Sequence, residues 1–517
     1  MKKLFKISAA LMALSMVVTS AGMTALADGE TASQKILLYE DMENITLDDF
    51  DKTTNRVHVY NNILNSIFTD KQYAYGTRDA YTTHADIQIK TEVDGNKVFS
   101  FKNTNTTAVP ATDGNLGKLW MKFDSSWVLD STNSDKLVVA YDISAKEIYA
   151  GQKESGFMGV PYCFDSTNKW YEFENFLNAG GIMRSIATDE NNKTTLSYAM
   201  RNTSGAAIGN SNSTEITEVS LGDVVRVALV IDNYEQSTAP VYKVVLFNEE
   251  GKIVLSGQYS SGQNGSFDAA TSLDGMAFRA NKGIEYVLDN VKAYTLPADK
   301  VFAVTSTDAV DVPITSSLDV KLNGYVTEGQ LGKITVKKGD KAVDPSEYTI
   351  TAKENTSAVE TTVSVKFNDK MSFGTTYSVV LPTTLKDETT TALAEETTVN
   401  FTTQAAPSFD VALAVTSGGE AVTALSGAAG KTVLCDVDVT HTTTRDSSGV
   451  IFVGLYDAEG NVVAYGSTDK AYTPNETDEI KVSLNVPDDT TGMSVKAFAC
   501  ESLSKLDNIF SDVAVLQ

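Results

Sequence analysis

The stretch that decides the fold is Gly222-Asp-Val-Val-Arg-Val-Ala-Leu-Val-Ile-Asp232, followed by Val241-Tyr-Lys-Val-Val-Leu-Phe-Asn248 and the turn Glu250-Gly251-Lys252. Both runs are rich in β-branched residues and are bounded by Gly, Asn or Asp, which predicts two strands joined as a hairpin. Similar short runs recur along the chain, and 136–142 is one of them. Many short strands with frequent turns predict an all-β protein built from β-sandwiches.

Helix-like patterns are confined to two short stretches. Ile63–Phe68 and Ser502–Ile509 are the segments in which we expect a short helix. No longer stretch of the exported chain has apolar residues at the 3.6-residue period of an amphipathic helix. Helices are therefore expected to contribute little to the fold.

Composition excludes more functions than it names. The chain has 517 residues, a length typical of about three domains. Its net charge of −25 argues against a nucleic-acid partner or an anionic membrane, because phosphate groups would be repelled. Three His and three Cys leave little material for metal or Cys/His chemistry.

The first 27 residues are predicted to be a signal peptide. Three lysines among the first six residues precede the apolar run Ile7–Val18, and Ala25-Leu-Ala27 is a cleavage site of the A-x-A type. The apolar run is short for a membrane span, which needs ~20 residues. We therefore expect an extracellular, cell-surface-associated protein that starts at Asp28 and does not insert into the membrane after cleavage.

Two Pro-containing stretches mark the domain boundaries. They are Leu296-Pro-Ala298 and Gln404-Ala-Ala-Pro407, where small residues separate strand patterns. The predicted division is a signal peptide at 1–27, a jelly roll at 28–297, an Ig-like domain at 298–404 and a C-terminal sandwich at 405–517.

The first module begins and ends with strand-like sequences that could pair with each other. Lys35-Ile-Leu-Leu-Tyr-Glu-Asp-Met-Glu-Asn44 opens it and Glu285-Tyr-Val-Leu-Asp-Asn-Val-Lys-Ala-Tyr294 closes it. With the hairpin above, these stretches resemble the concanavalin-A-like and laminin-G-like jelly rolls of secreted bacterial carbohydrate-active proteins. That resemblance implies binding of a glycan or, less often, its cleavage.

Three tryptophans are the candidate glycan-binding residues: Trp120, Trp127 and Trp170. The C–H faces of sugars stack on exposed aromatic rings. Strand alternation puts Trp120 on the face opposite Leu119, Met121 and Phe123, and Trp170 beside charged residues. Burial of these rings in a two-sheet core is the alternative.

Arg56, His58 and Tyr60 alternate onto one face of a predicted strand. An Arg that neutralises a uronate, with His and Tyr as base and acid, would suit β-elimination from an acidic polysaccharide. The longer motifs of jelly-roll lyases and of laminarinase-like hydrolases are absent. We therefore expect no enzymatic activity and keep this set as the catalytic alternative.

Four acidic residues near the two ends of the first module are candidate ligands of a structural Ca²⁺. They are Glu40, Asp41, Glu43 and Asp289, which supply the hard oxygen ligands that Ca²⁺ takes. Ordinary turn and edge carboxylates are the alternative. No cofactor is expected to be required.

The second module has the more specific resemblance. Met371-Ser-Phe-Gly-Thr-Thr-Tyr-Ser-Val-Val-Leu-Pro382 and Val399-Asn-Phe-Thr-Thr403 carry it. The module resembles the bacterial Ig-like domain of S-layer-type surface proteins, which implies a spacer without catalytic residues and a core position for Tyr377 and Phe401. One departure is Thr390, which stands where the family has the Gly of an Asp-x-x-Gly turn.

The last module resembles the small C-terminal sandwich of large secreted proteins of anaerobic Gram-positive bacteria, on stretches such as Val495-Lys-Ala-Phe-Ala499. Cys435 and Cys500 both lie on apolar runs. We expect two buried thiols here and keep a disulfide as the alternative. His441, in a Thr-rich segment, is expected to be solvated.

Together these patterns favour an exported glycan-binding or adhesive surface protein. Its jelly roll would bind a polysaccharide or a cell-wall glycan, and its Ig-like modules would act as spacers. A jelly-roll polysaccharide lyase or glycoside hydrolase is the first alternative, and a purely structural surface protein is the second.

Overall fold

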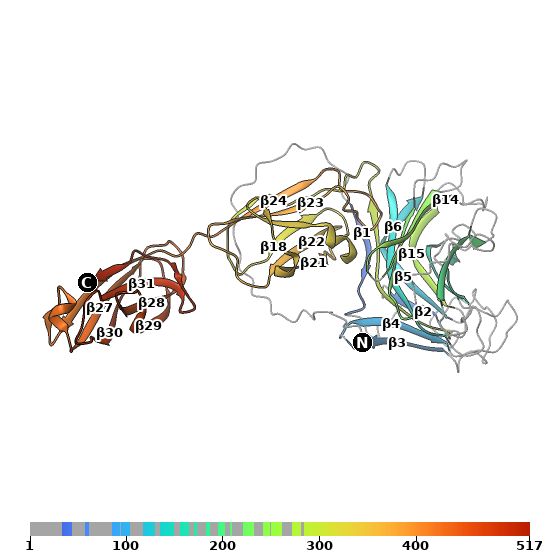
Figure 1. Cartoon of the computed structure of the whole chain (residues 1–517). Coiled ribbons are helices and arrows are strands. Elements are labelled where there is room, and N and C mark those ends of the chain that lie inside the picture. Colours follow the sequence, from blue (N-terminus) through green and yellow to red (C-terminus); the bar gives the residue numbers. More distant parts are fainter. Residues whose placement is uncertain are drawn as a thin grey trace. The chain divides into compact units, whose positions relative to one another are not determined.

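We analysed a computed structural model of the chain. The residues that it describes are 34–43, 57–60, 85–93, 95–103, 117–129, 135–148, 156–164, 170–172, 182–186, 195–201, 207–208, 221–231, 241–248, 250–260, 271–280 and 284–517. The protein is all-β, with a jelly-roll sandwich followed along the chain by two Ig-like sandwiches (Figure 1). This confirms the predicted fold class. Ile63–Phe68, one of the two expected helices, lies outside the described residues.

The jelly roll consists of two large antiparallel sheets. The first sheet has the order β14-β13-β12-β6-β16-β4-β3, with β1 also paired to β16. Its strands are β1 (Ile36–Glu40), β3 (Ala85–Thr91), β4 (Lys97–Asn103), β6 (Lys136–Ile148), β12 (Val225–Ile231), β13 (Val241–Phe247), β14 (Ile253–Ser260) and β16 (Ile284–Leu296). The two predicted strands are β12 and β13, which pair antiparallel, and β13 continues into β14 through a turn at Gly251, whose φ of +67° suits a residue without a Cβ.

The second sheet has the order β11-β10-β9-β7-β15-β5-β2, with β8 paired to β7. Its strands are β2 (Val57–Tyr60), β5 (Gly117–Leu129), β7 (Gly156–Phe164), β8 (Trp170–Glu172), β9 (Ile182–Ile186), β10 (Thr195–Arg201), β11 (Ala207–Ile208) and β15 (Thr271–Ala280). The two inner faces form the core. Tyr141 of the first sheet meets Phe278 of the second edge to face, with ring centroids 5.1 Å apart.

The pairing of the first and last strands confirms the jelly-roll prediction. β1 and β16 run antiparallel, and Leu38 lies opposite Ala293. A bulge interrupts β16 between Asp289 and Lys292, where Asn290 has a φ of +50°. The bulge lies beside the residues that contact the Ig-like module, described below.

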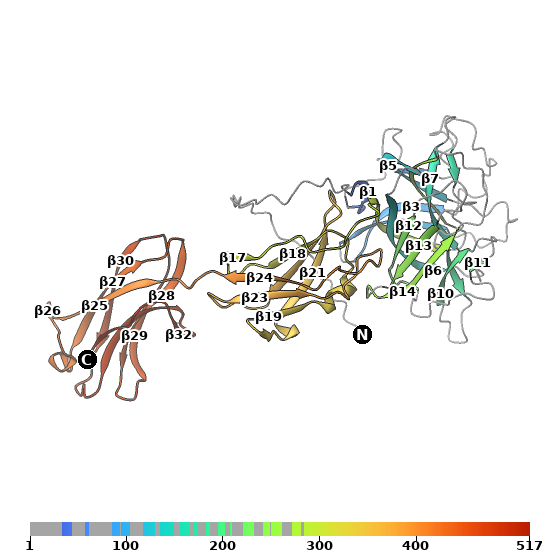
Figure 2. The same cartoon turned by 90° about the horizontal axis from the view of Figure 1, so that it is seen from above.

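The Ig-like module is a sandwich of a five-stranded and a three-stranded sheet (Figure 2). The sheets have the orders β17-β24-β23-β19-β20 and β18-β22-β21. The elements are β17 (Ala309–Val312), β18 (Leu318–Leu322), the 3-10 helix η6 (Glu328–Lys333), β19 (Thr335–Lys338), β20 (Lys341–Ala342), η7 (Pro345–Glu347), β21 (Tyr348–Glu354), β22 (Thr361–Phe367), β23 (Thr376–Leu381) and β24 (Thr397–Thr403).

Two details of this module follow from its sequence. Tyr377 and Phe401 are buried, at 3% and 5% exposure, which confirms their predicted core positions. Thr390 has a φ of +66°, so the chain makes the left-handed turn for which the family uses Gly. A β-branched residue is strained there.

The C-terminal sandwich also has two sheets, with the orders β26-β25-β27-β30 and β29-β28-β31-β32; β33 pairs with β31. The elements are β25 (Phe409–Ser417), β26 (Glu420–Ala421), η8 (Leu425–Ala428), β27 (Thr432–His441), β28 (Ser447–Tyr456), β29 (Val462–Tyr472), β30 (Thr477–Asn485), β31 (Ser494–Ser502), β32 (Lys505–Ile509) and β33 (Ala514–Leu516). The prediction of a helix at Ser502–Ile509 is wrong, because β32 occupies most of this segment and pairs with β31.

Three further expectations are tested in this sandwich. Cys435 and Cys500 are buried free thiols, as expected, and they lie in different sheets. The expectation that His441 is solvated is wrong. It is fully buried, its Nδ1 lies 2.9 Å from the Thr473 carbonyl oxygen, and its ring is 4.9 Å from that of Phe409.

The described residues fall into two compact units. The described residues within 1–308, 317–369 and 378–400 form the first unit, which therefore contains the jelly roll and most of the Ig-like module. Residues 309–316, 370–377 and 401–517 form the second unit. The domain limits at 297 and 404 stay predictions.

Candidate functional site

Trp120 lies in β5 of the second jelly-roll sheet, next to the edge strand β2. The backbone register pairs it with His58 of β2 on one side and with Ala277 of β15 on the other. Met121 and Phe123 are buried, at 1% and 3% exposure, so the odd-numbered positions of this part of β5 face the core, as the alternation predicts. Trp120 therefore occupies a position on the outer face.

The other two candidate tryptophans do not share this row. Trp127, also in β5, lies opposite Leu273 beyond a register shift. Trp170 lies in β8, opposite Phe164. Because only the backbone positions of the three tryptophans are described, the glycan-binding roles of their side chains stay predictions.

The catalytic alternative is partly placed. His58 and Tyr60 lie in β2, two residues apart, and Tyr60 is paired with Lys118. They therefore occupy one face of the strand, as predicted. Arg56 lies outside the described residues.

The four candidate calcium ligands are placed around one end of β16 and β1. Asp289 is buried, and its carboxylate accepts hydrogen bonds from Asn96 Nδ2 at 2.9 Å and from the Asn290 backbone N–H at 2.7 Å. Burial raises the pKa of Asp289 to about 7, although these two hydrogen bonds lower it.

The remaining candidate ligands also accept hydrogen bonds. Glu43 Oε1 accepts one from the Lys97 backbone N–H at 2.9 Å, and Glu40 and Asp41 accept from backbone N–H groups two residues further on. Within the described part of the chain, no three His, Cys, Asp or Glu residues come together as a metal site. Calcium binding by this set stays a prediction.

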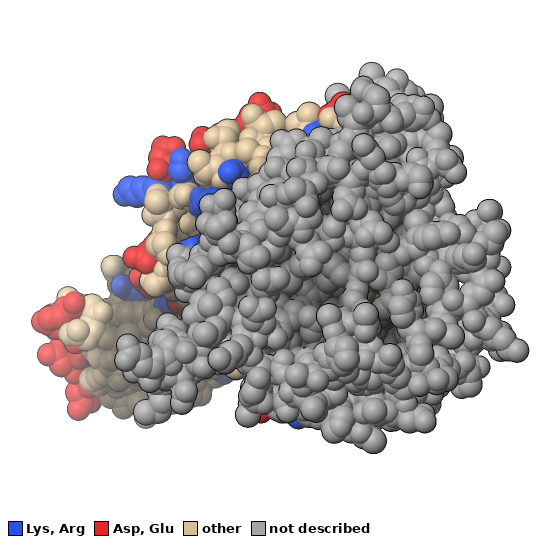
Figure 3. Space-filling view, turned by 90° about the vertical axis from the view of Figure 1, so that its right-hand side faces the viewer, with Lys and Arg blue, Asp and Glu red and all other residues tan. Residues whose placement is uncertain are grey.

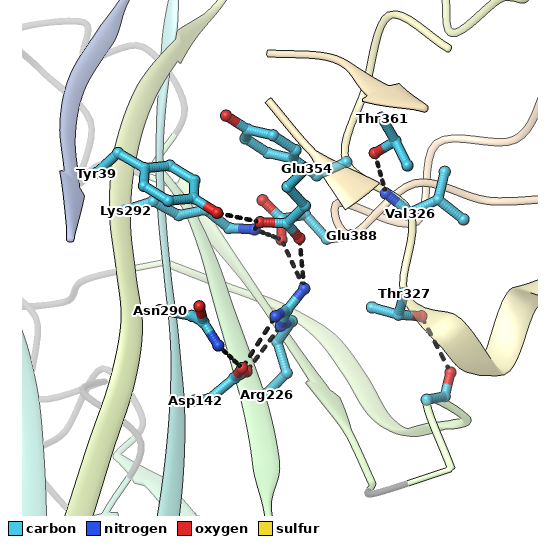
Figure 4. A network of polar contacts seen from close by, with 12 residues as sticks. Tyr39, Asp142, Arg226, Asn290, Lys292, Val326, Thr327, Glu354, Thr361 and Glu388 are labelled. Carbon is cyan, nitrogen blue, oxygen red and sulfur yellow. Dashed lines mark hydrogen bonds and ion pairs between the residues drawn. The ribbon is translucent and has the colours of Figure 1, made fainter. Parts of the chain in front are cut away.

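A buried charge cluster that sequence reasoning did not single out lies between the jelly roll and the Ig-like module (Figure 4). Lys292 of β16 is at its centre, with a side chain only 1% exposed. Its Nζ lies 2.7 Å from Glu354 Oε2 of β21 and 2.9 Å from Glu388 Oε2. The same ammonium lies 4.1 Å from the centre of the Tyr325 ring, a cation–π contact.

Arg226 of β12 is the second cation of the cluster. Its guanidinium binds Asp142 of β6 with two hydrogen bonds, of 2.7 and 2.9 Å, and Glu354 Oε1 with one of 2.7 Å. Asn290 Nδ2 donates to the same Asp142 at 2.8 Å. Arg226 thus connects a carboxylate of the jelly roll with one of the Ig-like module.

Two tyrosines of the jelly roll donate to the carboxylates of the Ig-like module. Tyr39 Oη donates to Glu354 Oε2 at 3.1 Å, and Tyr294 Oη donates to Glu388 Oε1 at 2.9 Å. Each carboxylate of the Ig-like module in the cluster is therefore held by a cation and a hydroxyl group. Such pairing is what allows charged groups to be buried.

The two carboxylates differ in their protonation. Burial raises the pKa of Glu354, but the nearby Lys292 and Arg226 outweigh it and lower that pKa to about 2. The pKa of Glu388 is raised, mainly by burial, although Lys292 lowers it. Two cations thus face three carboxylates, and Glu388 takes up a proton before Glu354 does as the pH falls.

Close backbone packing and apolar contacts complete the interface between the two modules. The hairpin turn of β13 and β14 packs against η6, where a Cβ on Gly329 would overlap the Glu250 carbonyl oxygen. Lys243 Nζ donates to the Thr389 carbonyl oxygen at 2.6 Å. Val138 and Tyr294 share an apolar cluster with residues of the Ig-like module, and the Tyr294 and Tyr325 rings lie 5.4 Å apart.

The consequence for the jelly roll is that the outer face of its first sheet is covered around β6, β12 and β16. Val138, Ala140 and Asp142 alternate with the core residues of β6, and they lie on the outer face with Arg226 and Lys292. The contact with the Ig-like module is made from this outer face. Among the described residues, the contacts with the Ig-like module come from the first sheet and its β13–β14 turn.

A signal for this cluster was present in the sequence. Lys292 lies between the apolar residues Val291 and Ala293 of the strand that ends the jelly roll, and Asp387-Glu388 follows a strand of the Ig-like module. Charged residues are rarely buried unless they are paired. Their partners come from strands far apart in the sequence, so the pairing could not be predicted. Among the described residues, no helix is long and apolar enough to cross a membrane.

Several solved structures are similar to the chain. Arcelin-5, a lectin-like defense protein from Phaseolus vulgaris, is 9% identical with a TM-score of 0.25, over 51% of this chain and 98% of its own. A lectin from Bauhinia forficata in complex with GalNAc is 7% identical with a TM-score of 0.27, over 52% and 100%. The CBM2 module of an evolved Dit protein of Lactobacillus casei phage J-1 is 8% identical with a TM-score of 0.29, over 52% and 98%.

Similarities of this size carry no argument about function. No curated protein matches the chain. A family model does match its middle part, and the match spans the sandwich in which Glu354 and Glu388 lie. Residues 297–403 match the family model of the bacterial Ig-like domain.

Proposed function

We propose that the protein is exported and binds a polysaccharide or cell-wall glycan through the outer face of the second jelly-roll sheet. In this proposal the Ig-like domain is a fixed mount for the jelly roll, and the two Ig-like sandwiches act as spacers. The protein has no enzymatic activity of its own and requires no cofactor.

The observation that carries the proposal is the contact between the jelly roll and the Ig-like domain. It covers the outer face of the first sheet around Val138, Arg226 and Lys292, so this part of the face is not available to a ligand. The second sheet is the remaining one. The register places Trp120 in its next-to-last strand, beside His58 of the edge strand β2. An aromatic residue with polar neighbours on a sheet face is what stacking of a sugar ring requires.

The position of the buried charge cluster also supports the role of the Ig-like domain as a fixed mount for the jelly roll. Ion pairs, close glycine contacts and apolar packing all act in the same interface. A glycan-binding module that is fixed to its spacer keeps its binding face in one orientation relative to that spacer. Export is supported by the signal-peptide pattern of residues 1–27.

A polysaccharide lyase is the second candidate function, because the strand register places residues that suit this reaction in neighbouring positions. His58 and Tyr60 share the outer face with Lys118, so a base, an acid and a cation occupy neighbouring positions. A positioned base and acid alone are a common arrangement of residues. We therefore propose binding without cleavage.

The proposal is tested by retention of residues 28–517 on a panel of immobilised neutral and acidic polysaccharides. Saturable retention on at least one polysaccharide, with no change in the polymer's length, is expected. Retention on none of them would favour the purely structural alternative, and shortening of the polymer would favour the lyase or hydrolase.

A further inference from the structure

The strands around Trp120 bring together basic residues of an otherwise acidic chain. Three rows of paired positions cross β2, β5, β15 and β7 on the outer face of the second sheet. The rows are Tyr60, Lys118, Arg279 and Met158; His58, Trp120, Ala277 and Val160; and Lys122, Gly275 and Tyr162. We call these positions the Trp120 face.

The assignment of these rows to one face rests on the core residues between them. Met121 and Phe123 alternate with the β5 positions of the Trp120 face and are buried. Met276 and Phe278 alternate with Ala277 and Arg279 and are buried as well, at 1% and 3% exposure. The pairing of β15 with both neighbours is continuous from Gly275 to Ala280, so the alternation is kept across the block.

The charge of the Trp120 face is opposite to that of the chain. Its first two rows contain Lys118, Arg279 and the titratable His58 and no Asp or Glu, and its third row contains Lys122 and borders on Glu172 of β8. The whole chain has 67 acidic against 42 basic residues. Acidic and basic side chains both appear on the described surface in Figure 3. Two acidic residues lie on the same outer face at the border of these rows: Glu172 is paired with Tyr162, and Asp124 follows Lys122 by two residues in β5.

We propose that the Trp120 face binds an anionic polysaccharide, one whose sugars carry carboxylate or sulfate groups. This inference rests on the proposed glycan-binding function and adds the chemical class of the glycan. Trp120 and Tyr60 supply aromatic rings for sugar stacking, and Lys118, Lys122 and Arg279 supply the positive charge. A local positive field on an acidic protein also selects the ligand, because an anionic chain is repelled elsewhere on the surface.

The test compares acidic polysaccharides with their own neutral forms. The probes are polygalacturonate, alginate and hyaluronate, each with its carboxyl-reduced counterpart, and dextran sulfate with dextran. The protein is residues 28–517, as wild type and as the triple variant Lys118→Gln, Lys122→Gln, Arg279→Gln. The matched control neutralises three exposed lysines of the Ig-like domain: Lys338→Gln, Lys341→Gln and Lys366→Gln.

Wild type is expected to bind at least one acidic polymer about tenfold more tightly than its neutral form, and to lose this preference as salt is added. The triple variant should lose the preference, and the control should keep it. Comparison of the carboxylated polysaccharides with dextran sulfate identifies the anionic group that the protein binds.

Two outcomes overturn the inference in different ways. Equal binding of acidic and neutral forms, unchanged in the triple variant, would contradict the anionic ligand and leave the proposed glycan binding in place. Binding to none of these polymers and to no neutral polysaccharide would contradict the proposed function itself. Circular dichroism of the variants distinguishes loss of binding from loss of the fold.

Discussion

Lys292 of the jelly roll lies 2.7 Å from Glu354 of the Ig-like domain, and the lysine side chain is only 1% exposed. This ion pair is the centre of a contact that also includes Arg226 and Glu388 (Figure 4). Two modules joined at residue 297 by a short stretch of chain are thereby held to each other through buried charge. The role of the Ig-like domain as a fixed mount depends on this contact.

Removal of the lysine should be far more costly than removal of an exposed one. Lys292→Ala leaves Glu354 and Glu388 buried without their cation, so we expect the free energy of unfolding of the jelly roll to fall by about 3–5 kcal/mol. Denaturant unfolding followed by tryptophan fluorescence measures this, because all three tryptophans lie in the jelly-roll sequence.

Lys321→Ala is the matched control for this prediction. Lys321 pairs with Glu360 at 3.1 Å, but its side chain is 54% exposed, and such pairs contribute about 1 kcal/mol or less. Equal losses in Lys292→Ala and Lys321→Ala would show that the cluster does not hold the two modules together.

A methyl group on η6 should disrupt the same contact without a change in charge. Gly329→Ala places a Cβ against the Glu250 carbonyl oxygen and the Gly251 Cα, so the hairpin has to move away. We expect a loss of about 1–3 kcal/mol, the usual cost of overpacking. Gly332→Ala, in the same 3-10 helix, meets no atom within 4 Å and should be neutral. Comparable Tm values for the two variants would refute the described packing.

Stability should fall as the pH rises from about 4 to about 7. Burial raises the pKa of Asp387 to about 7, against hydrogen bonds from Thr389 and Thr391 that lower it, whereas an unfolded Asp has a pKa of about 3.9. The neutral form is therefore favoured in the folded state. The contribution of the neutral Asp387 carboxyl group to stability is complete below the pKa that it has in the unfolded state. This contribution is lost as the pH rises through the pKa of the folded state.

Asp387→Asn should flatten this fall, since the amide stays neutral and its oxygen can still accept the same hydrogen bonds. The pKa of Asp289 is also raised to about 7, so part of the pH dependence of stability should remain in Asp387→Asn. The pKa of Glu354 is lowered, so its contribution is lost below about pH 4.5 instead. Unfolding free energies at about pH 4 and about pH 7 test this, and an unchanged slope in Asp387→Asn would contradict it.

The strands were largely predictable because their sequences carry the period of a pleated sheet. The pairing of Val225–Ile231 with Val241–Phe247 and the pairing of the first strand with the last follow from alternation and turn residues. The helix expected at Ser502–Ile509 failed because β31 offers a pairing partner there, which a local pattern cannot show. His441 was misjudged for a similar reason, since its partners Thr473 and Phe409 are distant in sequence.

The charge cluster was not predictable, although its residues were visible. Each member is an ordinary charged residue on a strand or in a turn, and burial appears only when two modules pack together. Lys292 is 62 residues from Glu354, and Arg226 is 128 residues from it. Trp120, in contrast, was assigned to the correct side of its strand by the apolar residues Met121 and Phe123.

The absence of catalysis is a prediction of the binding proposal. Incubation of the chain with acidic polysaccharides should give no unsaturated ends, and His58→Ala should therefore change nothing in that assay. Ultraviolet absorbance of the products measures this. Release of unsaturated oligosaccharides by wild type, abolished in His58→Ala, would establish the lyase instead.

The most direct test of the account is a paired measurement on Trp120→Ala: glycan retention and melting temperature on the same preparation. A ring that stacks on sugar contributes on the order of 1–3 kcal/mol to binding, so retention should weaken by roughly tenfold or more. The melting temperature should stay close to that of wild type. Tyr465→Ala, which removes a 58% exposed ring in the C-terminal sandwich, should alter neither quantity. A large fall in melting temperature would identify Trp120 as a core residue, whose removal costs about 3–5 kcal/mol. That result, or unchanged retention in Trp120→Ala, would contradict the proposed binding face.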